Sequence, residues 1–213
     1  MVRILIIVLI ALSTALVHSN TNQIFVGDFS QMGLSGWEKK SFHGDTEYAI
    51  VGDRQQKYLR ASANSTASAL FKKVSVDLNR TPYLNWTWRI DKSLMPIDEL
   101  TKQGDDYAAR VYVIVKRGLA PWKTNALNYV WSSNPQPPMS WPNAYTEKAI
   151  MIPLRTQNDD KSWKVEKVNV KNDFEKYFGL EIERIDGVAI MTDTDNSQSQ
   201  AIASYGDIFF TAD

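Results

Sequence analysis

The sequence contains no cysteine, and this absence excludes several kinds of chemistry. Without thiols the chain can form no disulfide, no thiolate metal site and no cysteine-based catalytic centre. A chain of 213 residues buries a core large enough to be stable without disulfides. The lack of cysteine is therefore compatible with an oxidising compartment.

Histidine is scarce as well, and the charges cancel. The chain has two histidines, and it contains no nucleophile elbow, phosphate-binding loop or His-x-x-x-His metal motif. We therefore assign no catalytic residues. Lys and Arg number 24 and Asp and Glu also number 24, so the formal net charge is zero. A nucleic-acid partner usually requires a basic face, and we expect no such partner.

The longest apolar run lies at the N-terminus. Arg3 precedes unbroken apolar residues from Ile4 to Leu12, and Val17 and Ser19 occupy the two positions that a signal peptidase reads before a cleavage site. The run is shorter than the roughly 20 residues of a membrane span. We expect residues 1–19 to be a cleaved signal peptide and the protein to be periplasmic or secreted, with no stable membrane insertion after cleavage. An uncleaved anchor is the alternative.

The rest of the chain reads as short strands separated by turn residues. The strands are rich in Val, Ile, Phe, Tyr and Trp, and no domain boundary or repeat is visible. We expect residues 20–213 to form a single domain, a two-sheet antiparallel β-sandwich of the jelly-roll, galactose-binding-like type. The expected strands are Gln23–Phe29, Tyr48–Val51, Tyr58–Ala61, Ala69–Val76, Tyr83–Ile90, Ala108–Lys116, Asn128–Ser132, Ala149–Leu154, Trp163–Val170, Ile185–Thr192 and Ala203–Thr211.

Two short connector helices are expected beside the strands. Asp173 can cap a turn that carries Phe174 and Phe178, and Gly179 can end it in a left-handed conformation. The second candidate is Leu94–Lys102. Neither segment carries obvious chemistry.

Two strands place polar residues where a central strand should be apolar. Alternation assigns Tyr107, Ala109, Val111, Val113 and Val115 to the core, which leaves Asp106, Arg110 and Tyr112 on the other face. Arg89 likewise lies opposite the apolar Trp86 and Trp88.

If the two strands are neighbours, Arg89, Asp106, Arg110 and Tyr112 share a face. Asp105 points to the opposite face or into the preceding loop. Partly buried arginines need acidic partners or an anionic ligand. The face is therefore either an internal Arg–Asp network or a ligand-binding surface.

A proline-rich stretch presents two tryptophans, Trp122 and Trp141. Prolines reduce the entropy that a loop loses when it holds one shape, so the stretch could form the lip of a binding cleft. The alternative is that both tryptophans plug the open end of the sandwich.

Acidic residues follow a hydrophobic strand near the C-terminus. Asp193, Asp195 and Asn196 could offer oxygen ligands to calcium, although the loop lacks the glycine and distal glutamate of an EF-hand. A plain turn, in which these side chains bond their own backbone, explains the pattern equally simply. Asp207 lies inside the last strand and needs an arginine or a cation as partner.

Several spaced motifs together resemble a bacterial family catalogued as domain of unknown function 3047. The resemblance covers nearly all of the chain after the N-terminal segment, and it implies an exported, β-rich protein of Gram-negative bacteria with no assigned activity. The motifs are Trp86-Thr87-Trp88-Arg89, Gly104-Asp105-Asp106-Tyr107-Ala108-Ala109-Arg110-Val111-Tyr112, Tyr129-Val130-Trp131, Phe178-Gly179, Met191-Thr192-Asp193-Thr194-Asp195-Asn196 and Tyr205-Gly206-Asp207-Ile208.

A looser likeness joins the two ends of the chain to galactose-binding-type jelly rolls and carbohydrate-binding modules. Gly27-Asp28-Phe29 and Gly206-Asp207-Ile208 are similar to the segments that begin and end such domains. The likeness implies a structural calcium ion near the joined termini, with Asp28 and Asp207 as its ligands. No other cofactor is expected.

These observations predict a binding protein for a glycan or a similar polar small molecule. Aromatic rings would stack on sugar faces, and Arg89, Asp106 and Arg110 would bind hydroxyl or anionic groups. One alternative is an enzyme that acts on an envelope polysaccharide with paired aspartates. Another is a structural domain with no small ligand. The oligomeric state is left open.

Export can be tested directly. We expect the protein isolated from the envelope or the medium to begin immediately after Ser19, because the apolar run and the residues before the site fit a signal peptidase. Mass spectrometry of the intact protein measures this terminus. Cytoplasmic protein that retains Met1 would contradict the expectation.

Overall fold

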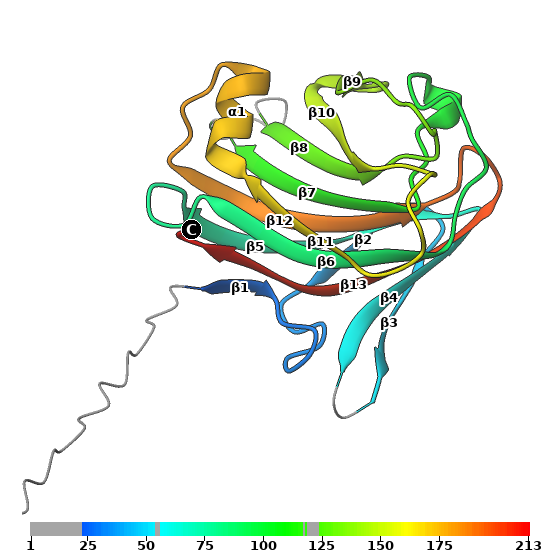
Figure 1. Ribbon diagram of the computed structural model, residues 1–213, viewed down its shortest axis with the longest axis horizontal. Coiled ribbons are helices and arrows are strands. Elements are labelled where there is room, and N and C mark those ends of the chain that lie inside the picture. The colour runs from blue at the N-terminus through cyan, green and yellow to red at the C-terminus, as the bar shows by residue number, and fades with distance from the viewer. Residues whose placement is uncertain (1–22, 54–55, 117, 119–123) are drawn as a thin grey trace, which may run out of the picture.

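A computed structural model describes residues 23–53, 56–116, 118 and 124–213, which form a two-sheet β-sandwich (Figure 1). The expected signal peptide and Trp122 lie outside the described residues. The six-stranded sheet has the order β11-β6-β13-β4-β3, and β1 pairs with β13. Its strands are β1 (Ile24–Gly27), β3 (Glu47–Gly52), β4 (Lys57–Asn64), β6 (Tyr83–Lys92), β11 (Lys164–Asn169) and β13 (Gln200–Thr211).

The seven-stranded sheet has the order β2-β5-β12-β7-β8-β10-β9. Its neighbours pair antiparallel except β8 and β10, which are parallel. The sandwich is therefore not purely antiparallel. The strands are β2 (Glu38–His43), β5 (Ala67–Asp77), β7 (Ala109–Lys116), β8 (Thr124–Trp131), β9 (Trp141–Asn143), β10 (Thr146–Arg155) and β12 (Arg184–Asp193).

Each strand expected from the sequence overlaps an observed one, and the sandwich class is confirmed. Strands β2 and β9 were missed for identifiable reasons. All six residues of β2 are exposed, so it shows no apolar alternation. Strand β9 has three residues and contains Pro142, which lacks an amide hydrogen for the sheet.

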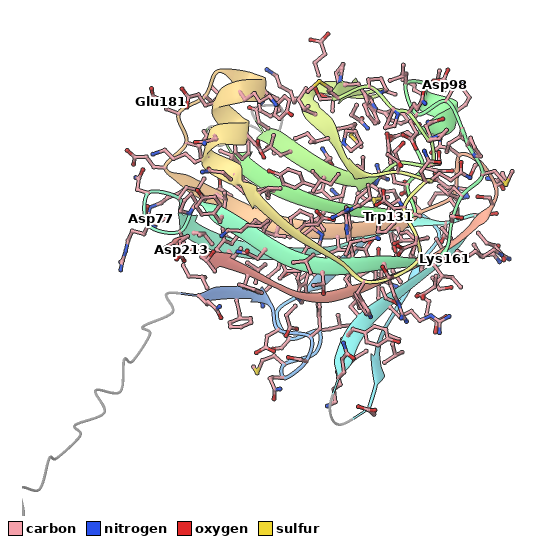
Figure 2. All side chains as sticks on the ribbon, in the orientation of Figure 1. Asp77, Asp98, Trp131, Lys161, Glu181 and Asp213 are labelled. Atoms are coloured by element: carbon pink, nitrogen blue, oxygen red, sulfur yellow. The ribbon has the colours of Figure 1, made fainter. Side chains whose placement is uncertain are left out.

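The core between the sheets depends on aromatic side chains from facing strands. Trp86 and Trp88 of β6 are buried, and their rings meet edge to face at 5.4 Å. Across the sandwich Trp86 lies 5.6 Å from Tyr129 and Trp88 lies 5.7 Å from Trp131, both of β8. Side chains fill the space between the sheets, as Figure 2 shows around Trp131. The inward assignment of Trp86, Trp88 and the alternate residues of β7 is confirmed.

One of the two expected helices forms. Helix α1 (Val170–Phe178) ends at Gly179, which has a φ of 63° and a left-handed conformation. Its N-cap is Asn169, whose side chain accepts a hydrogen bond from the amide of Asn172, so the expected cap at Asp173 is wrong. Asp173 instead accepts a 2.7 Å hydrogen bond from the Tyr129 hydroxyl.

The second candidate helix, Leu94–Lys102, is wrong. The segment is irregular and ends in one 3₁₀ turn, η1 (Lys102–Gly104), at the end of the sandwich opposite α1 (Figure 1). Within the described ranges, no helix has the length and apolarity that a membrane crossing requires.

A buried carboxylate ties the two sheets together. Glu166 of β11 accepts a 2.8 Å hydrogen bond from the Trp88 indole and a 2.6 Å hydrogen bond from Nε of Arg155, which belongs to β10 in the other sheet. Hydrogen bonds to charged groups contribute more than neutral ones because the donor meets a full negative charge. Glu166 therefore fixes a core tryptophan and the spacing of the sheets at the same time.

We expect Glu166→Gln to lower the free energy of unfolding by about 1.5–3 kcal/mol, because it weakens charge-assisted bonds in a buried site. Urea denaturation measures the loss. Asp160→Asn is the matched control, since the carboxylate of Asp160 is 72% exposed in its pair with Lys164 and its loss should change the midpoint far less. Equal midpoints for both variants would show that Glu166 does not hold the sheets together.

Candidate binding site

Arg110 is a charged residue buried on the outer face of the seven-stranded sheet. Its neighbours Ala109 and Val111 point into the core, so the pleat of β7 turns Arg110 away from it. Arg110 is nevertheless only 3% exposed. Its guanidinium forms a salt bridge with Asp193 of the adjacent strand β12, where Met191 is the direct register partner of Arg110. Arg110 therefore has an acidic partner on the neighbouring strand.

Further groups surround the same guanidinium. Asp105 lies 3.7 Å from Nη1 of Arg110 and accepts a 2.8 Å hydrogen bond from Asn143. The rings of Tyr107 and Tyr112 lie 4.8 and 5.6 Å from the guanidinium carbon, within the range of cation–π attraction. Arg110 is therefore held between two carboxylates and two aromatic rings.

Burial and charge act in opposite directions on the carboxylates. Burial raises the pKa of Asp193, and the guanidinium of Arg110 opposes that rise. Burial likewise raises the pKa of Asp105, and the charge of Arg110 again opposes the rise. Asp193 also accepts a 3.2 Å hydrogen bond from the Tyr107 amide, so each of its oxygens has a donor. The ionised state of Asp193 therefore depends on Arg110.

These residues form part of a pocket of about 540 Å³ on the outer face of the sheet. Each of the seven strands contributes at least one lining side chain, so the pocket crosses the strands. Phe42 and Tyr145 stand exposed at its rim, 60% and 57% accessible. The lining residues are Phe42, Ala67, Asp105, Arg110, Tyr112, Asn128, Asn143, Tyr145, Thr146, Ala149, Met191, Asp193, Asp195 and Asn196.

Two buried polar atoms in this lining have no hydrogen-bond partner among the described residues. They are Nε of Arg110, a donor, and Oδ1 of Asn128, an acceptor. Asn128 is 1% exposed and is the register partner of Tyr112, two residues along β7 from Arg110. Buried polar groups without partners are rare and destabilise a fold. Both atoms thus present unsatisfied hydrogen-bonding capacity within one pocket.

Asp106 has a different role from the one expected. It is fully buried and accepts hydrogen bonds from the amides of Asn196 and Ser197, at 3.2 and 2.6 Å, so it orders the β12–β13 loop. It is Asp105 that approaches Arg110. The assignment of Tyr107 to the core is also wrong: β7 begins at Ala109, and Tyr107 packs on the outer face with Val130, Trp141 and Met151.

Asp106, Asp193 and Asp195 each offer a carboxylate oxygen within 4.8 Å of the others. Burial raises the pKa of Asp195, and the charge of Asp106 raises it further. A calcium site at this loop stays a prediction. Asn196 directs its side-chain amide to the carbonyl of Lys102, 2.8 Å away, and to the Tyr145 hydroxyl at 3.3 Å.

The looser likeness implies Asp28 and Asp207 as calcium ligands. They lie at the six-stranded sheet, where β1 leads into the following turn, and not at the pocket on the seven-stranded sheet. The hydroxyl of Ser30 donates to Asp207 at 2.7 Å and to Asp28 at 3.2 Å, and Asp28 also caps the amide of Gln31. The structure therefore brings Asp28 and Asp207 to the same serine. Calcium binding by them stays a prediction.

Arg89 does not share a face with Arg110, and that expectation is wrong. Strands β6 and β7 are consecutive in the chain but belong to different sheets, so the two arginines lie on opposite outer faces. Arg89 pairs with Asp91 at 3.1 Å, and its guanidinium carbon lies 5.4 and 5.0 Å from the rings of Tyr58 and Trp163.

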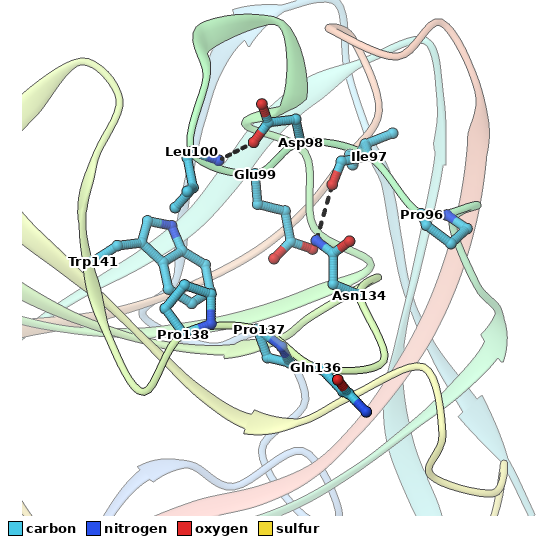
Figure 3. A pocket seen from close by; sticks show the side chains of 10 residues that line it. All are labelled: Pro96, Ile97, Asp98, Glu99, Leu100, Asn134, Gln136, Pro137, Pro138 and Trp141. Carbon is cyan, nitrogen blue, oxygen red and sulfur yellow. Dashed lines mark hydrogen bonds between the residues drawn. The ribbon is translucent and has the colours of Figure 1, made fainter.

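Trp141 is a packing residue rather than an exposed platform. It is 5% exposed and covers the outer face of the sheet beside Tyr107. One edge of its ring lines a second pocket, of about 410 Å³, formed by residues 96–100 and the proline-rich loop (Figure 3). Glu99 is buried there and accepts bonds of 2.6–2.8 Å from Ser132 and Ser133, so its carboxylate is already satisfied.

Sequence reasoning missed several lining residues. Asn128 carried a usable signal, because it is a polar residue that alternates with the apolar Leu127 and Tyr129 in a strand that was expected. Phe42 and Tyr145 gave no signal, since each lies in a segment without apolar periodicity. Asn143 and Thr146 flank Tyr145, in a part of the chain where the sequence predicted no strand.

We expect Arg110→Ala to destabilise the fold by about 3–5 kcal/mol at neutral pH, because it leaves Asp193 as an unpaired buried carboxylate. Burial raises the folded-state pKa of Asp193 in both proteins, and in the variant the guanidinium that opposes this rise is gone, so the folded-state pKa lies further above the unfolded value. The folded variant then binds more protons than the unfolded chain, so it gains stability as the pH falls. The difference from the wild type should therefore shrink from neutral towards acidic pH in urea denaturation.

The double variant Arg110→Ala/Asp193→Asn is the control, because removing both charges avoids the stranded carboxylate. It should recover much of the lost stability and show no comparable pH dependence. A single variant that loses less than about 1 kcal/mol at neutral pH would show that Asp193 does not depend on Arg110.

Several solved structures are similar to the chain. The family 30 carbohydrate-binding module of cellulase Cel9D-Cel44B of Clostridium thermocellum is 10% identical with a TM-score of 0.49, over 84% of this chain and 92% of that one. A loop-swap mutant of Necallimastix patriciarum Xyn11A is 13% identical with a TM-score of 0.46, over 91% and 98%. The Spr0440 glycoside hydrolase domain, Endo-D from Streptococcus pneumoniae R6, is 11% identical with a TM-score of 0.42, over 83% of this chain. The chain spans only 22% of that domain.

No curated protein matches the chain. Residues 35–209 match the family described as "Protein of unknown function (DUF3047)", which confirms the resemblance drawn from the spaced motifs. That match covers most of the chain, including every lining residue of the pocket. The chain belongs to the DUF3047 family.

Proposed function

We propose that the protein binds a glycan in the pocket on the outer face of the seven-stranded sheet. The observation that carries this proposal is the pair of unpartnered atoms, Nε of Arg110 and Oδ1 of Asn128. One is a donor and the other an acceptor. A hydroxyl group donates one hydrogen bond and accepts others, so the hydroxyls of a sugar can serve both atoms.

The rim supports the same ligand class. Phe42 and Tyr145 are large exposed aromatic residues at the pocket, and aromatic faces pack against the flat apolar faces of sugar rings. The Tyr145 hydroxyl is held by Asn196 and by the carbonyl of Lys102, so its ring is ordered before a ligand arrives. A preordered ring lowers the entropy cost of binding.

The shape of the site favours part of a chain over a compact small molecule. Because the lining comes from every strand of the sheet, a ligand that fills the pocket crosses the strands. We also propose that the protein is exported, on the basis of its N-terminal segment. Export would bring the pocket to the polysaccharides of the cell envelope.

We expect Asn128→Leu, which keeps the branching of the side chain but removes its polar atoms, to weaken glycan binding at least about tenfold, which corresponds to about 1.4 kcal/mol. The same change should leave the melting temperature equal or higher, because it removes an unsatisfied buried acceptor. Phe42→Ala and Tyr145→Ala should weaken binding without unfolding the protein, since both side chains are exposed. A glycan array followed by titration calorimetry and thermal melting measures all three.

Phe25→Ala is the matched control. Phe25 is 46% exposed and lies against Phe209 in the six-stranded sheet, which does not line the pocket, so its loss should not change glycan affinity. A wild-type protein that binds no glycan on the array, or an Asn128→Leu variant that binds as tightly as the wild type, would overturn the proposal.

A further inference from the structure

The charges that line the pocket do not balance. Three lining residues are carboxylates, Asp105, Asp193 and Asp195, and Arg110 is the one cation among the described lining residues. Arg110 is shared, since it contacts Asp193 directly and lies 3.7 Å from Asp105. A fourth carboxylate, Asp106, lies buried close to Asp193 and Asp195.

Asp195 is the lining carboxylate that has no cationic partner among the described residues. Among the described residues no lysine, arginine or histidine nitrogen lies within salt-bridge distance of it, whereas Asp193 and Asp105 both have Arg110. Asp106 and Asp195 offer carboxylate oxygens that lie within 4.8 Å of each other, and negative charges at that separation repel. A positive group in the pocket would remove that repulsion.

The cations outside the lining do not fill this role. Lys40 and Lys102 lie over the rings of Phe42 and Tyr145, at 5.3 and 5.2 Å, and so stand at the rim. His43 is near enough to favour the charged form of Asp195, but it lies in an exposed strand next to solvent. Water and salt screen exposed charges more strongly than buried ones, so the carboxylates determine the sign of the field inside the pocket.

We infer that the ligand is an amino sugar polymer with free, protonated amines, and that the pocket rejects polymers of uronic acids. This inference rests on the proposed glycan binding and names its substrate class. The hydroxyls of the sugar meet Arg110 and Asn128, while an ammonium group meets Asp195. A uronate in the same place would bring its own carboxylate against Asp195, and like-charge contacts of that kind are strongly unfavourable.

The test compares three oligosaccharides of equal length by titration calorimetry in mildly acidic buffer. They are a β-1,4-linked glucosamine oligomer, its N-acetylated form and a galacturonate oligomer. We expect the free-amine oligomer to bind about tenfold more tightly than the acetylated one, as one charge-assisted contact can provide. The preference should decrease as salt is added, and the galacturonate oligomer should not bind.

Asp195→Asn should bring the ratio of the two glucosamine affinities close to one, because it removes the charge that selects the amine. Asp160→Asn is the matched control and should keep the wild-type ratio, since Asp160 is an exposed residue of the β10–β11 turn. Equal affinities for amine and acetylated oligomers, preferred binding of galacturonate, or an unchanged ratio in Asp195→Asn would each overturn the inference and leave glycan binding standing. Absence of binding by any sugar would overturn the proposed function itself.

Discussion

The buried ion pair between Arg110 and Asp193 constrains the whole outer face of the seven-stranded sheet. A guanidinium that is 3% exposed needs compensation for its lost hydration, and it receives that compensation from two carboxylates and two tyrosine rings. Those groups come from β7, from β12 and from the segment before β7. The pair therefore fixes the register of two strands and the path of the chain that enters one of them.

The two faces of the seven-stranded sheet have different roles: the inner face packs the core, and the outer face carries the polar residues of the pocket. On the inner face, alternate residues of β7 and β8 pack against the tryptophans of β6, and this packing supplies the hydrophobic stabilisation. On the outer face the same strands present Arg110, Tyr112 and Asn128. Because the side chains of a strand alternate, a stable core and a polar site can be encoded in one segment without conflict.

Alternation is also what made part of the structure predictable. Trp86, Trp88 and Val111 were placed correctly in the core because a period of two requires no knowledge of neighbouring strands. Strand order is a different matter. Arg89 and Arg110 lie on consecutive strands with similar patterns, yet the chain crosses between sheets after β6, and no local feature of the sequence records that crossing.

The site was predictable to the same extent and for the same reason. Arg110 was recognised because a charge between apolar neighbours is unusual, and Asp193 was recognised as a candidate ligand, but their pairing depends on β7 and β12 being adjacent. The choice between Asp105 and Asp106 depended on where β7 begins. Alternation counted from the wrong residue placed Asp106 on the same face as Arg110, but its oxygens accept hydrogen bonds from the amides of Asn196 and Ser197.

An unsatisfied donor and acceptor in a well-packed sheet require an explanation, because each lowers the stability of the unliganded protein. An apolar side chain at position 128 would be compatible with β8. Leu127 and Tyr129 pack in the core between the sheets, and Val130 packs in the apolar cluster on the outer face. In the described residues the Asn128 side chain donates one long hydrogen bond, 3.5 Å from Nδ2 to the carbonyl of Ala126, and its buried Oδ1 has no partner. Under the proposed function, a sugar hydroxyl in the pocket would offset that cost, and it would equally serve Nε of Arg110, the guanidinium atom that Asp193 and Asp105 leave without a partner.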